Sequence, residues 1–358
     1  MSLGRIAVLG AGGFLGSHLV PALVQRFGCE VDAVDIDLQK LEARDSRIQR
    51  IEARVEDVAA MRRVTARSSV VLSLTALCNP AQYSTIPLEV IDANFTHLIP
   101  LVNLCAKDKI RLIHFSTAEV YGRRALDAAG DPTLEMSEDS SCFLMGPIAR
   151  ERWTYACAKQ LLERVIWAHG EHGQLPFTII RPFNTIGPRM DFVPGIDGEG
   201  TPRVLACFMS QLLRGAPLQL VDGGTQKRAF MSVGDMVEAI CRVVERPEAC
   251  NGQILNLGNP RNNVSIAELG VLLARVYAQV AGDTRAPRFE SVSANEFYGP
   301  GYDDTGERIP DIQKARRLLD WEPTESLSDM LPAIVADYVK RYGALVEPAG
   351  QFEFNRAS

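Results

Sequence analysis

The chain has 358 residues, of which 46% are hydrophobic and 23% charged, a balance that is ordinary for a globular protein. Its net charge of -6 argues against a nucleic acid or an anionic membrane as partner, because there is no surplus of positive charge to neutralise phosphates. No apolar run approaches the roughly 20 residues of a membrane span, and MSLGRIAVLG does not have the pattern of a signal peptide, so we expect a cytoplasmic protein.

The first half of the sequence alternates short apolar runs with amphipathic segments. Runs rich in Val, Ile and Leu predict buried strands, and apolar residues three or four apart predict helices between them. The predicted strands are RIAVLG (5–10), CEVDAVDI (29–36), SVVLSL (69–74), RLIHFS (111–116), PFTIIRP (176–182) and, later in the chain, ILNLG (254–258). This alternation predicts an α/β fold with a Rossmann-like, doubly wound parallel sheet covered by helices on both faces.

The character of the sequence changes at about residue 183, where a loop rich in glycine, proline and aspartate begins. Two helical patterns follow, at 265–282 and 326–343. We expect residues 1–182, with the returning strand at 254–258, to form the Rossmann domain. Residues 183–345 are expected to form most of a smaller, interleaved, C-terminal substrate-binding lobe, and residues 346–358 a disordered tail.

A glycine-rich turn, GAGGFLG, follows the first predicted strand and opens the next helix. Gly10, Gly13 and Gly16 have a GxxGxxG spacing. Glycines there permit a tight turn and a close approach of the backbone to a pyrophosphate. The first helical residues, Phe14 and Leu15, lie at a helix N-terminus, which offers free N–H groups and the positive end of a dipole. The turn therefore predicts dinucleotide binding.

An acidic residue follows at about the interval that such sites require, roughly 20 residues after the turn. Asp35 ends the second predicted strand, and Asp37 is an alternative two residues later. A carboxylate at this place accepts hydrogen bonds from ribose hydroxyls and repels a 2′-phosphate. The predicted cofactor is therefore NAD rather than NADP.

A phenol and an amine lie one helical turn apart in WTYACAKQ, as Tyr155 and Lys159. A nearby ammonium and the positive charge of an oxidised nicotinamide favour the phenolate, which can then take a proton from an alcohol. Ser116 and Thr117 follow the strand RLIHF, at the end of a sheet where α/β proteins bind ligands. Chance alone gives many such Tyr–Lys pairs, but together these features predict an alcohol dehydrogenation site.

These features together resemble the extended short-chain dehydrogenase/reductase superfamily over nearly the whole chain. Within this superfamily, the sequence resembles the UDP-apiose/UDP-xylose synthases and, less closely, the decarboxylase domain of the polymyxin-resistance enzyme. The blocks that carry the resemblance are LCNPAQY (77–83), STAEVYG (116–122), RERWTYACAKQ (150–160), RPFNTIGPRMDFVPGIDG (181–198), PRVLACF (202–208), VDGGTQKRAF (221–230) and FYGPGYDDTGERIPD (297–311).

The resemblance implies oxidation of C4 of UDP-glucuronate by NAD, followed by loss of carbon dioxide from the resulting β-keto acid. It implies that Glu119 and Arg308 act in decarboxylation and that Arg152 lies in the active site. An arginine suits a sugar carboxylate because it can pair with both oxygens; the alternative for Arg308 is a surface salt bridge. The remaining positions that match substrate-binding residues are Tyr83, Asn184, Arg203, Arg228 and Tyr302.

One position departs from the family pattern. The apiose-forming enzymes carry two active-site cysteines; Cys78 matches the first, but Ala118 stands where the second would be. Alanine has no thiol to exchange protons. The bound 4-keto-pentose then has three fates: release, reduction to UDP-xylose, or ring contraction to UDP-apiose.

Two other functions remain as alternatives. A UDP-glucuronate C4 epimerase would use the same Tyr155, Lys159 and Thr117 but would retain the carboxylate. A non-catalytic, NAD-binding regulatory protein would be expected to have lost one of these three residues. The resemblance also implies a homodimer that forms through two helices per subunit, one of them the Tyr155 helix. None of the eight cysteines forms a CxxC pair, and we expect no metal site.

Overall fold

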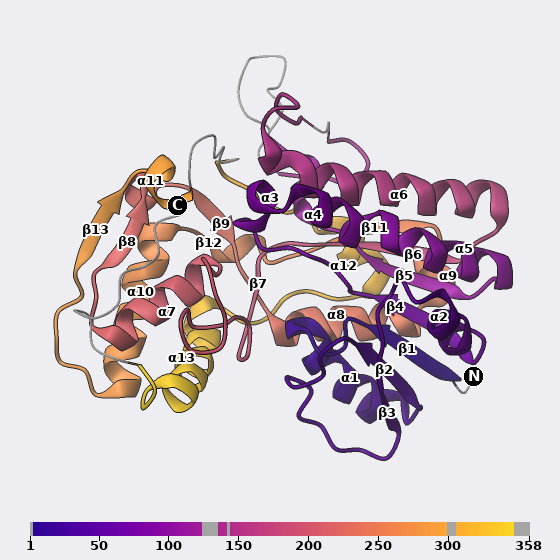
Figure 1. Cartoon of the computed structure of the whole chain (residues 1–358), viewed down its shortest axis with the longest axis horizontal. Helices are drawn as coiled ribbons and strands as arrows, with labels where there is room; N and C mark the ends of the chain where they lie inside the picture. The colour runs from indigo at the N-terminus through magenta and orange to yellow at the C-terminus, as the bar shows by residue number, and fades with distance from the viewer. Residues whose placement is uncertain (1–2, 124–134, 142–143, 299–305, 347–358) are drawn as a thin grey trace.

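The computed structural model describes residues 3–123, 135–141, 144–298 and 306–346 (Figure 1). Tyr302 and nearly all of the expected tail, 347–358, lie outside the described residues. In the described part of the chain, none of the helices combines the length and the apolar character that crossing a bilayer requires.

A seven-stranded parallel sheet forms the centre of the larger part of the molecule, in the order β11-β6-β5-β4-β1-β2-β3. Its strands are β1 (Arg5–Leu9), β2 (Val31–Asp35), β3 (Ile48–Glu52), β4 (Ser68–Ser73), β5 (Arg111–Phe115), β6 (Phe177–Pro182) and β11 (Gln253–Leu257). The strand β1 pairs with β2 on one side and with β4 on the other. The strand order therefore reverses beside β1, which is where doubly wound sheets form a ligand-binding crevice.

Helices cover both faces of this sheet. Alternate strand residues point to opposite faces, so that Ile6 and Val8 join one apolar core while Ala7 and Leu9 join the other. The first core includes α1 (Phe14–Phe27), α8 (Val233–Glu245) and α12 (Gln313–Leu319). The second includes α2 (Val58–Thr65), α5 (Ile99–Asp108) and α6 (Thr154–Gly173). The predicted doubly wound α/β fold is thus confirmed.

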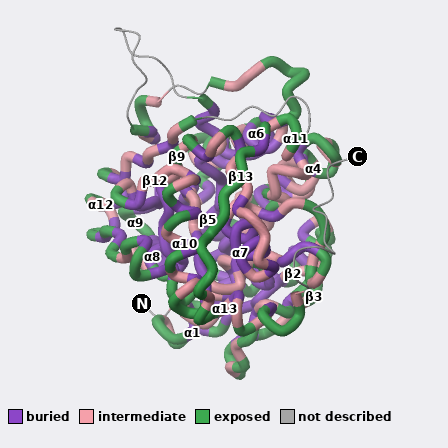
Figure 2. Tube along the Cα trace, turned by 90° about the vertical axis from the view of Figure 1, so that its left-hand side faces the viewer, coloured by how far each residue is buried: buried purple, intermediate pink, exposed green. Residues whose placement is uncertain are grey.

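A third apolar core holds the smaller lobe, at the left of Figure 1. Its main helices are α7 (Val204–Arg214), α10 (Ile266–Ala281) and α13 (Leu327–Tyr342), and both α10 and α13 begin with a serine that forms a capping box. Its strand pairs are β8 (Leu218–Val221) with β13 (Phe289–Val292), and β9 (Lys227–Ala229) with β12 (Asn263–Ser265). Figure 2 shows β13 as an exposed strand that crosses the surface of this lobe.

The remaining short helices and strands are α3 (Gln82–Thr85), α4 (Pro87–Asn94), β7 (Thr185–Ile186), β10 (Met231–Ser232), α9 (Pro247–Cys250) and α11 (Ala294–Tyr298). We propose that the sheet domain comprises the N-terminal part together with α8, β11 and α12, because these later elements pack in its core rather than in that of the lobe. The smaller lobe is then interleaved with the sheet domain along the chain.

Candidate active site

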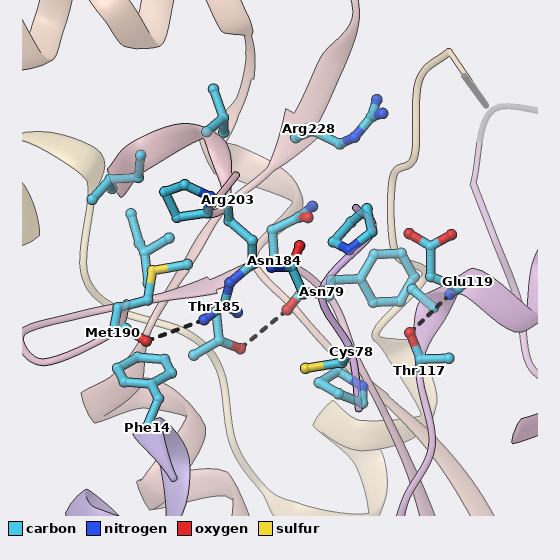
Figure 3. A pocket seen from close by; sticks show the side chains of 18 of the residues that line it. Phe14, Cys78, Asn79, Thr117, Glu119, Asn184, Thr185, Met190, Arg203 and Arg228 are labelled. Carbon is cyan, nitrogen blue, oxygen red and sulfur yellow. Dashed lines mark hydrogen bonds between the residues drawn. The ribbon is translucent and has the colours of Figure 1, made fainter. Parts of the chain in front are cut away.

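A pocket of about 470 Å³ opens at the carboxyl ends of the strands, between the sheet and the smaller lobe. Figure 3 shows Thr117 and Glu119 at one side of it, Phe14 and Met190 at the other, and Cys78 between them. The predicted site residues that line it are Gly10, Gly13, Phe14, Leu15, Gly16, Cys78, Tyr83, Thr117, Glu119, Arg152, Tyr155, Asn184, Arg203, Arg228 and Arg308. Asp35 and Lys159 do not line the pocket; each lies next to residues that do.

The glycine-rich turn has the shape that a dinucleotide requires. Gly10 has a φ of +85°, which strains any residue with a side chain. A Cβ on Gly16 would lie 2.2 Å from the carbonyl oxygen of Gly10, so α1 can approach the turn only with glycine at this position. No side chain caps α1 at Gly13, and the first N–H groups of the helix, from Phe14 onward, are available to a pyrophosphate. The turn therefore fits NAD.

The two candidate acidic residues differ in their surroundings. The Asp35 carboxylate accepts hydrogen bonds from the N–H groups of Gly12 at 2.9 Å and Ile36 at 2.7 Å. Burial raises the pKa of Asp35, although these N–H groups act in the opposite direction. The exposed Asp37 instead accepts from the N–H of Gln39 at 2.9 Å, in its own turn. Asp35, fixed against the glycine-rich turn, is the residue that fits a ribose.

Asp35→Asn is expected to weaken NAD binding about tenfold, since a hydrogen bond to a charged group contributes about 1.5 kcal/mol or more. It should also narrow the preference for NAD over NADP, because the repulsive charge is gone. Titration of the protein with both cofactors measures the two effects. Asp37→Asn is the matched control, and an equal or larger loss in that variant would assign the ribose to Asp37.

Tyr155 lies at the first turn of α6, where it is only 5% exposed. Its ring stacks on Tyr83, with 5.0 Å between ring centroids and 11° between planes. Thr117 lines the same pocket, and its side chain acts to lower the pKa of Tyr155. Thr117 also accepts the N–H of Glu119 at 3.1 Å, which fixes the turn after β5. The phenol and the threonine hydroxyl can therefore contact one substrate oxygen together.

Lys159 is fully buried one turn further along α6. Its Nζ donates to the carbonyl oxygen of Phe115 at 2.9 Å, and burial lowers its pKa to about 8. We expected Lys159 to lower the pKa of Tyr155, but burial raises that pKa well above its usual range. The phenolate is therefore favoured only once a further positive charge enters the site, as an oxidised nicotinamide supplies.

Glu119 forms ion pairs with two arginines that are distant in sequence. Its Oε2 lies 2.6 Å from Nη2 of Arg152, and its Oε1 lies 2.5 Å from Nη1 of Arg308. Burial alone would raise the pKa of Glu119, but the two guanidinium groups outweigh it and lower the pKa to about 2. Arg308 is 5% exposed and lines the pocket, which rules out the alternative of a surface salt bridge.

The remaining predicted residues hold the other walls. Cys78 is a free, exposed thiol, and its carbonyl oxygen accepts from the Tyr83 hydroxyl at 3.1 Å. Asn184 donates to the carbonyl oxygen of Ala229 at 3.4 Å. Arg228 donates to the carbonyl oxygens of Lys227, at 2.8 Å, and Gly306.

Ala118 lines the pocket and is 5% exposed, so the position of the missing cysteine does face the pocket.

Sequence reasoning did not identify the residue that orients Arg203. Asp191 accepts from the backbone N–H of Arg203 at 3.0 Å and from its Nε at 3.2 Å, and the carbonyl oxygen of Met190 accepts from Nη2 at 3.2 Å. Asp191 lies in the glycine- and proline-rich loop, where no periodicity marks it. Among the described residues, no group of three or more His, Cys, Asp or Glu side chains could hold a metal ion.

Comparison with known proteins agrees with this geometry. The profile of the NAD dependent epimerase/dehydratase family matches residues 6–258. The UDP-D-apiose/UDP-D-xylose synthase 1 of Arabidopsis thaliana is 42% identical over 96% of this chain and 93% of its own. The UDP-D-apiose/UDP-D-xylose synthase of Oryza sativa subsp. japonica is 41% identical over 94% and 89%.

Two solved structures are similar to this chain over nearly their whole length. The PbgP3 protein from Burkholderia pseudomallei has a TM-score of 0.82 and 32% identity, and the match covers 95% of this chain and 97% of that one. A UDP-glucuronic acid 4-epimerase from Bacillus cereus, solved with UDP-glucuronic acid and NAD, has a TM-score of 0.75 and 25% identity over 94% and 99%. By its glycine-rich turn, its Tyr155–Lys159 pair and these matches, the chain belongs to the NAD dependent epimerase/dehydratase family of extended short-chain dehydrogenases/reductases.

Proposed function

We propose that this protein catalyses the NAD-dependent oxidative decarboxylation of UDP-glucuronate, through a UDP-4-keto-hexuronate, to a UDP-4-keto-pentose. NAD is the cofactor of the family. The observation that carries the proposal is the cluster of Glu119 with Arg152 and Arg308, which lines the same pocket as Tyr155 and Thr117. The near-full-length likeness to UDP-D-apiose/UDP-D-xylose synthases supports the same substrate class.

The oxidation step follows from the Tyr155 end of the pocket. Tyr155, as phenolate, takes the proton of the C4 hydroxyl, and Thr117 holds that oxygen in place. Bound NAD supplies a hydride acceptor for C4. Lys159, paired with the carbonyl of Phe115, stays beside the base and keeps the positive charge near it. The product is a ketone β to the sugar carboxylate.

The decarboxylation step follows from the Arg308 end. The bond between C5 and the carboxylate carbon breaks, its electron pair moves toward the C4 ketone oxygen, and carbon dioxide leaves. A proton then replaces the lost group at C5. Arg308 is placed to bind the substrate carboxylate, while Glu119, which stays ionised, orients Arg308 and Arg152. An epimerase would have to protect the carboxylate from this loss, and the Glu119–Arg308 pair argues against that function.

Ala118→Cys is expected to raise the share of UDP-apiose among the products, because it restores the second thiol of the family pattern on the pocket wall. NMR of the products over time measures the partition between the keto-pentose, xylose and apiose forms. The parent protein should release mainly the keto-pentose or UDP-xylose. If the apiose share does not rise in the variant, position 118 is not the sole determinant of ring contraction.

The surface of α6 supports the expected homodimer. α4 packs beside α6 (Figure 1), and the two helices expose Leu88, Ile91, Leu161 and Trp167. Large apolar side chains that are exposed on neighbouring helices are a feature of protein–protein interaction sites. A second copy that packs on α4 and α6 would cover them, and sedimentation of the purified protein tests this.

The experiment that tests the proposed function is incubation of the protein with UDP-glucuronate and NAD, followed by NMR and mass spectrometry. Loss of carbon dioxide with formation of a UDP-pentose is the expected result. A C4 epimer that retains the carboxylate would instead make the protein an epimerase. NAD binding without turnover would contradict the proposed substrate or leave a regulatory role.

A further inference from the structure

A buried hydrogen-bond network connects the two segments that carry the Glu119–Arg308 pair. At its centre is Asn256, a fully buried residue of β11. Its Oδ1 accepts from the hydroxyl of Tyr121 at 2.8 Å, and its Nδ2 donates to the carbonyl oxygens of Met136 at 2.8 Å and Asp311 at 3.1 Å. One carboxamide therefore joins three segments that are distant in sequence.

The Tyr121 side of this network fixes the turn that holds Glu119. Glu119 and Tyr121 belong to one 3₁₀ turn, which the N–H of Gly122 closes on the carbonyl oxygen of Glu119 at 2.9 Å. The Tyr121 hydroxyl also accepts from Nη1 of Arg181 at 2.9 Å, and Arg181 is paired with Glu163 at 2.6 Å. Because burial raises the pKa of Tyr121 to about 12, its hydroxyl remains a donor to Asn256 at neutral pH.

The other side of the network fixes the segment that holds Arg308. The N–H of Met136 donates to the carbonyl oxygen of Ile309 at 2.8 Å. In return, the carbonyl oxygen of Met136 accepts from the N–H of Asp311 at 2.9 Å. Asn256 donates to the carbonyl oxygens of Met136 and of Asp311, three residues beyond Arg308, and so attaches these two paired segments to β11. Asn256 is thus hydrogen-bonded both to the turn that carries Glu119, through the Tyr121 hydroxyl, and to the backbone that follows Arg308.

The placement of this pair matters because the substrate carboxylate has to share Arg308 with Glu119. A displacement of about 1 Å in a catalytic arrangement can reduce rates about 100-fold. We propose that Asn256 is a positioning residue that sets Arg308 relative to Glu119, and thereby controls decarboxylation rather than hydride transfer. This inference rests on the proposed function. The base Tyr155 belongs to α6 and stacks on Tyr83, and the hydrogen bonds of the Asn256 side chain go to neither of them.

Asn256→Asp tests the inference with minimal change in volume. The carboxylate still offers an oxygen to Tyr121, but it places a second oxygen, instead of a donor, opposite the carbonyls of Met136 and Asp311. After rapid mixing with UDP-glucuronate and NAD, absorbance of NADH reports oxidation, and mass spectrometry gives the ratio of carboxylated to decarboxylated 4-keto sugar. The expected result is a ratio that rises about 10- to 100-fold, with NADH formation nearly unchanged.

Asn262→Asp is the matched control, since Asn262 is also buried and donates to a backbone carbonyl, that of Glu325 at 2.9 Å. Its product ratio should equal that of the parent protein. Where Asn256→Asp does not fold, Tyr121→Phe removes one bond of the same network and should shift the ratio in the same direction. An unchanged ratio in the folded variant, with both steps slowed equally, would overturn the inference. Failure of the parent protein to release carbon dioxide would instead refute the proposed function.

Discussion

Tyr155→Phe is expected to lower the rate of NADH formation from UDP-glucuronate by about 10²- to 10⁴-fold, the usual contribution of a general base. The variant lacks only the hydroxyl, which is the group that would accept the proton of the C4 hydroxyl. Its ring can keep the stack on Tyr83, so the fold and the pocket walls should persist. NADH absorbance in single-turnover experiments measures the effect, and NAD titration shows whether the cofactor still binds.

Tyr277→Phe is the matched control for this experiment. Tyr277 is a similarly buried tyrosine in α10, within the core of the smaller lobe. Its loss of a hydroxyl should leave the rate of NADH formation unchanged. Normal NADH formation in Tyr155→Phe, with the control intact, would refute the assignment of the base and would point to a different proton acceptor.

The sheet could be predicted because its strands are buried on both faces and therefore read as continuous apolar runs. Six strands of the sheet were recognised in this way. β3 was not, because IQRIE mixes two isoleucines with polar residues. It lies at the edge of the sheet, and only Ile48 of its five residues is buried. α8 was also missed, although it is strongly amphipathic, because it lies in the part of the sequence that was assigned to the substrate lobe.

The candidate site was predictable where it depends on local spacing. The glycine-rich turn and the Tyr155–Lys159 pair are each contained within one turn of helix and its flanks. The choice between Asp35 and Asp37 needed the structure, because only Asp35 accepts the N–H of Gly12. The family resemblance, which the relatives confirm, was needed to single out Arg308, since 189 residues separate it from Glu119. No spacing rule connects such residues.

The pKa of Tyr155 shows a further limit of sequence reasoning. The four-residue spacing correctly places Lys159 on the same helix as Tyr155. It does not predict the orientation of the Lys159 Nζ, which donates to the carbonyl oxygen of Phe115. Nor does the spacing show that the phenol is buried, which raises its pKa. The Asn256 network was equally invisible, because its strength depends on four segments that meet only in the folded chain.

Arg308→Ala is expected to lower kcat/KM for carbon dioxide release about 10- to 150-fold, since a hydrogen bond to a charged group contributes about 1.5–3 kcal/mol. The substrate carboxylate would lose its partner, and UDP-4-keto-hexuronate should accumulate. The pKa of Glu119, now about 2, should rise, because one of the two guanidinium groups that lower it is gone. Mass spectrometry of quenched reactions measures the keto acid, and KM separates binding from the chemical step.

Loss of a buried arginine can also destabilise the protein, and the experiment has to separate this effect from catalysis. Arg111→Ala provides the match: Arg111 is also buried, but it donates to the carbonyl oxygens of Val243 and Val244 at the opposite end of the sheet. Both variants should lower the free energy of unfolding, whereas only Arg308→Ala should accumulate the keto acid. Unchanged carbon dioxide release in a folded Arg308→Ala would remove Arg308 from the reaction, and the proposal would then depend on Arg152 as the group that binds the carboxylate.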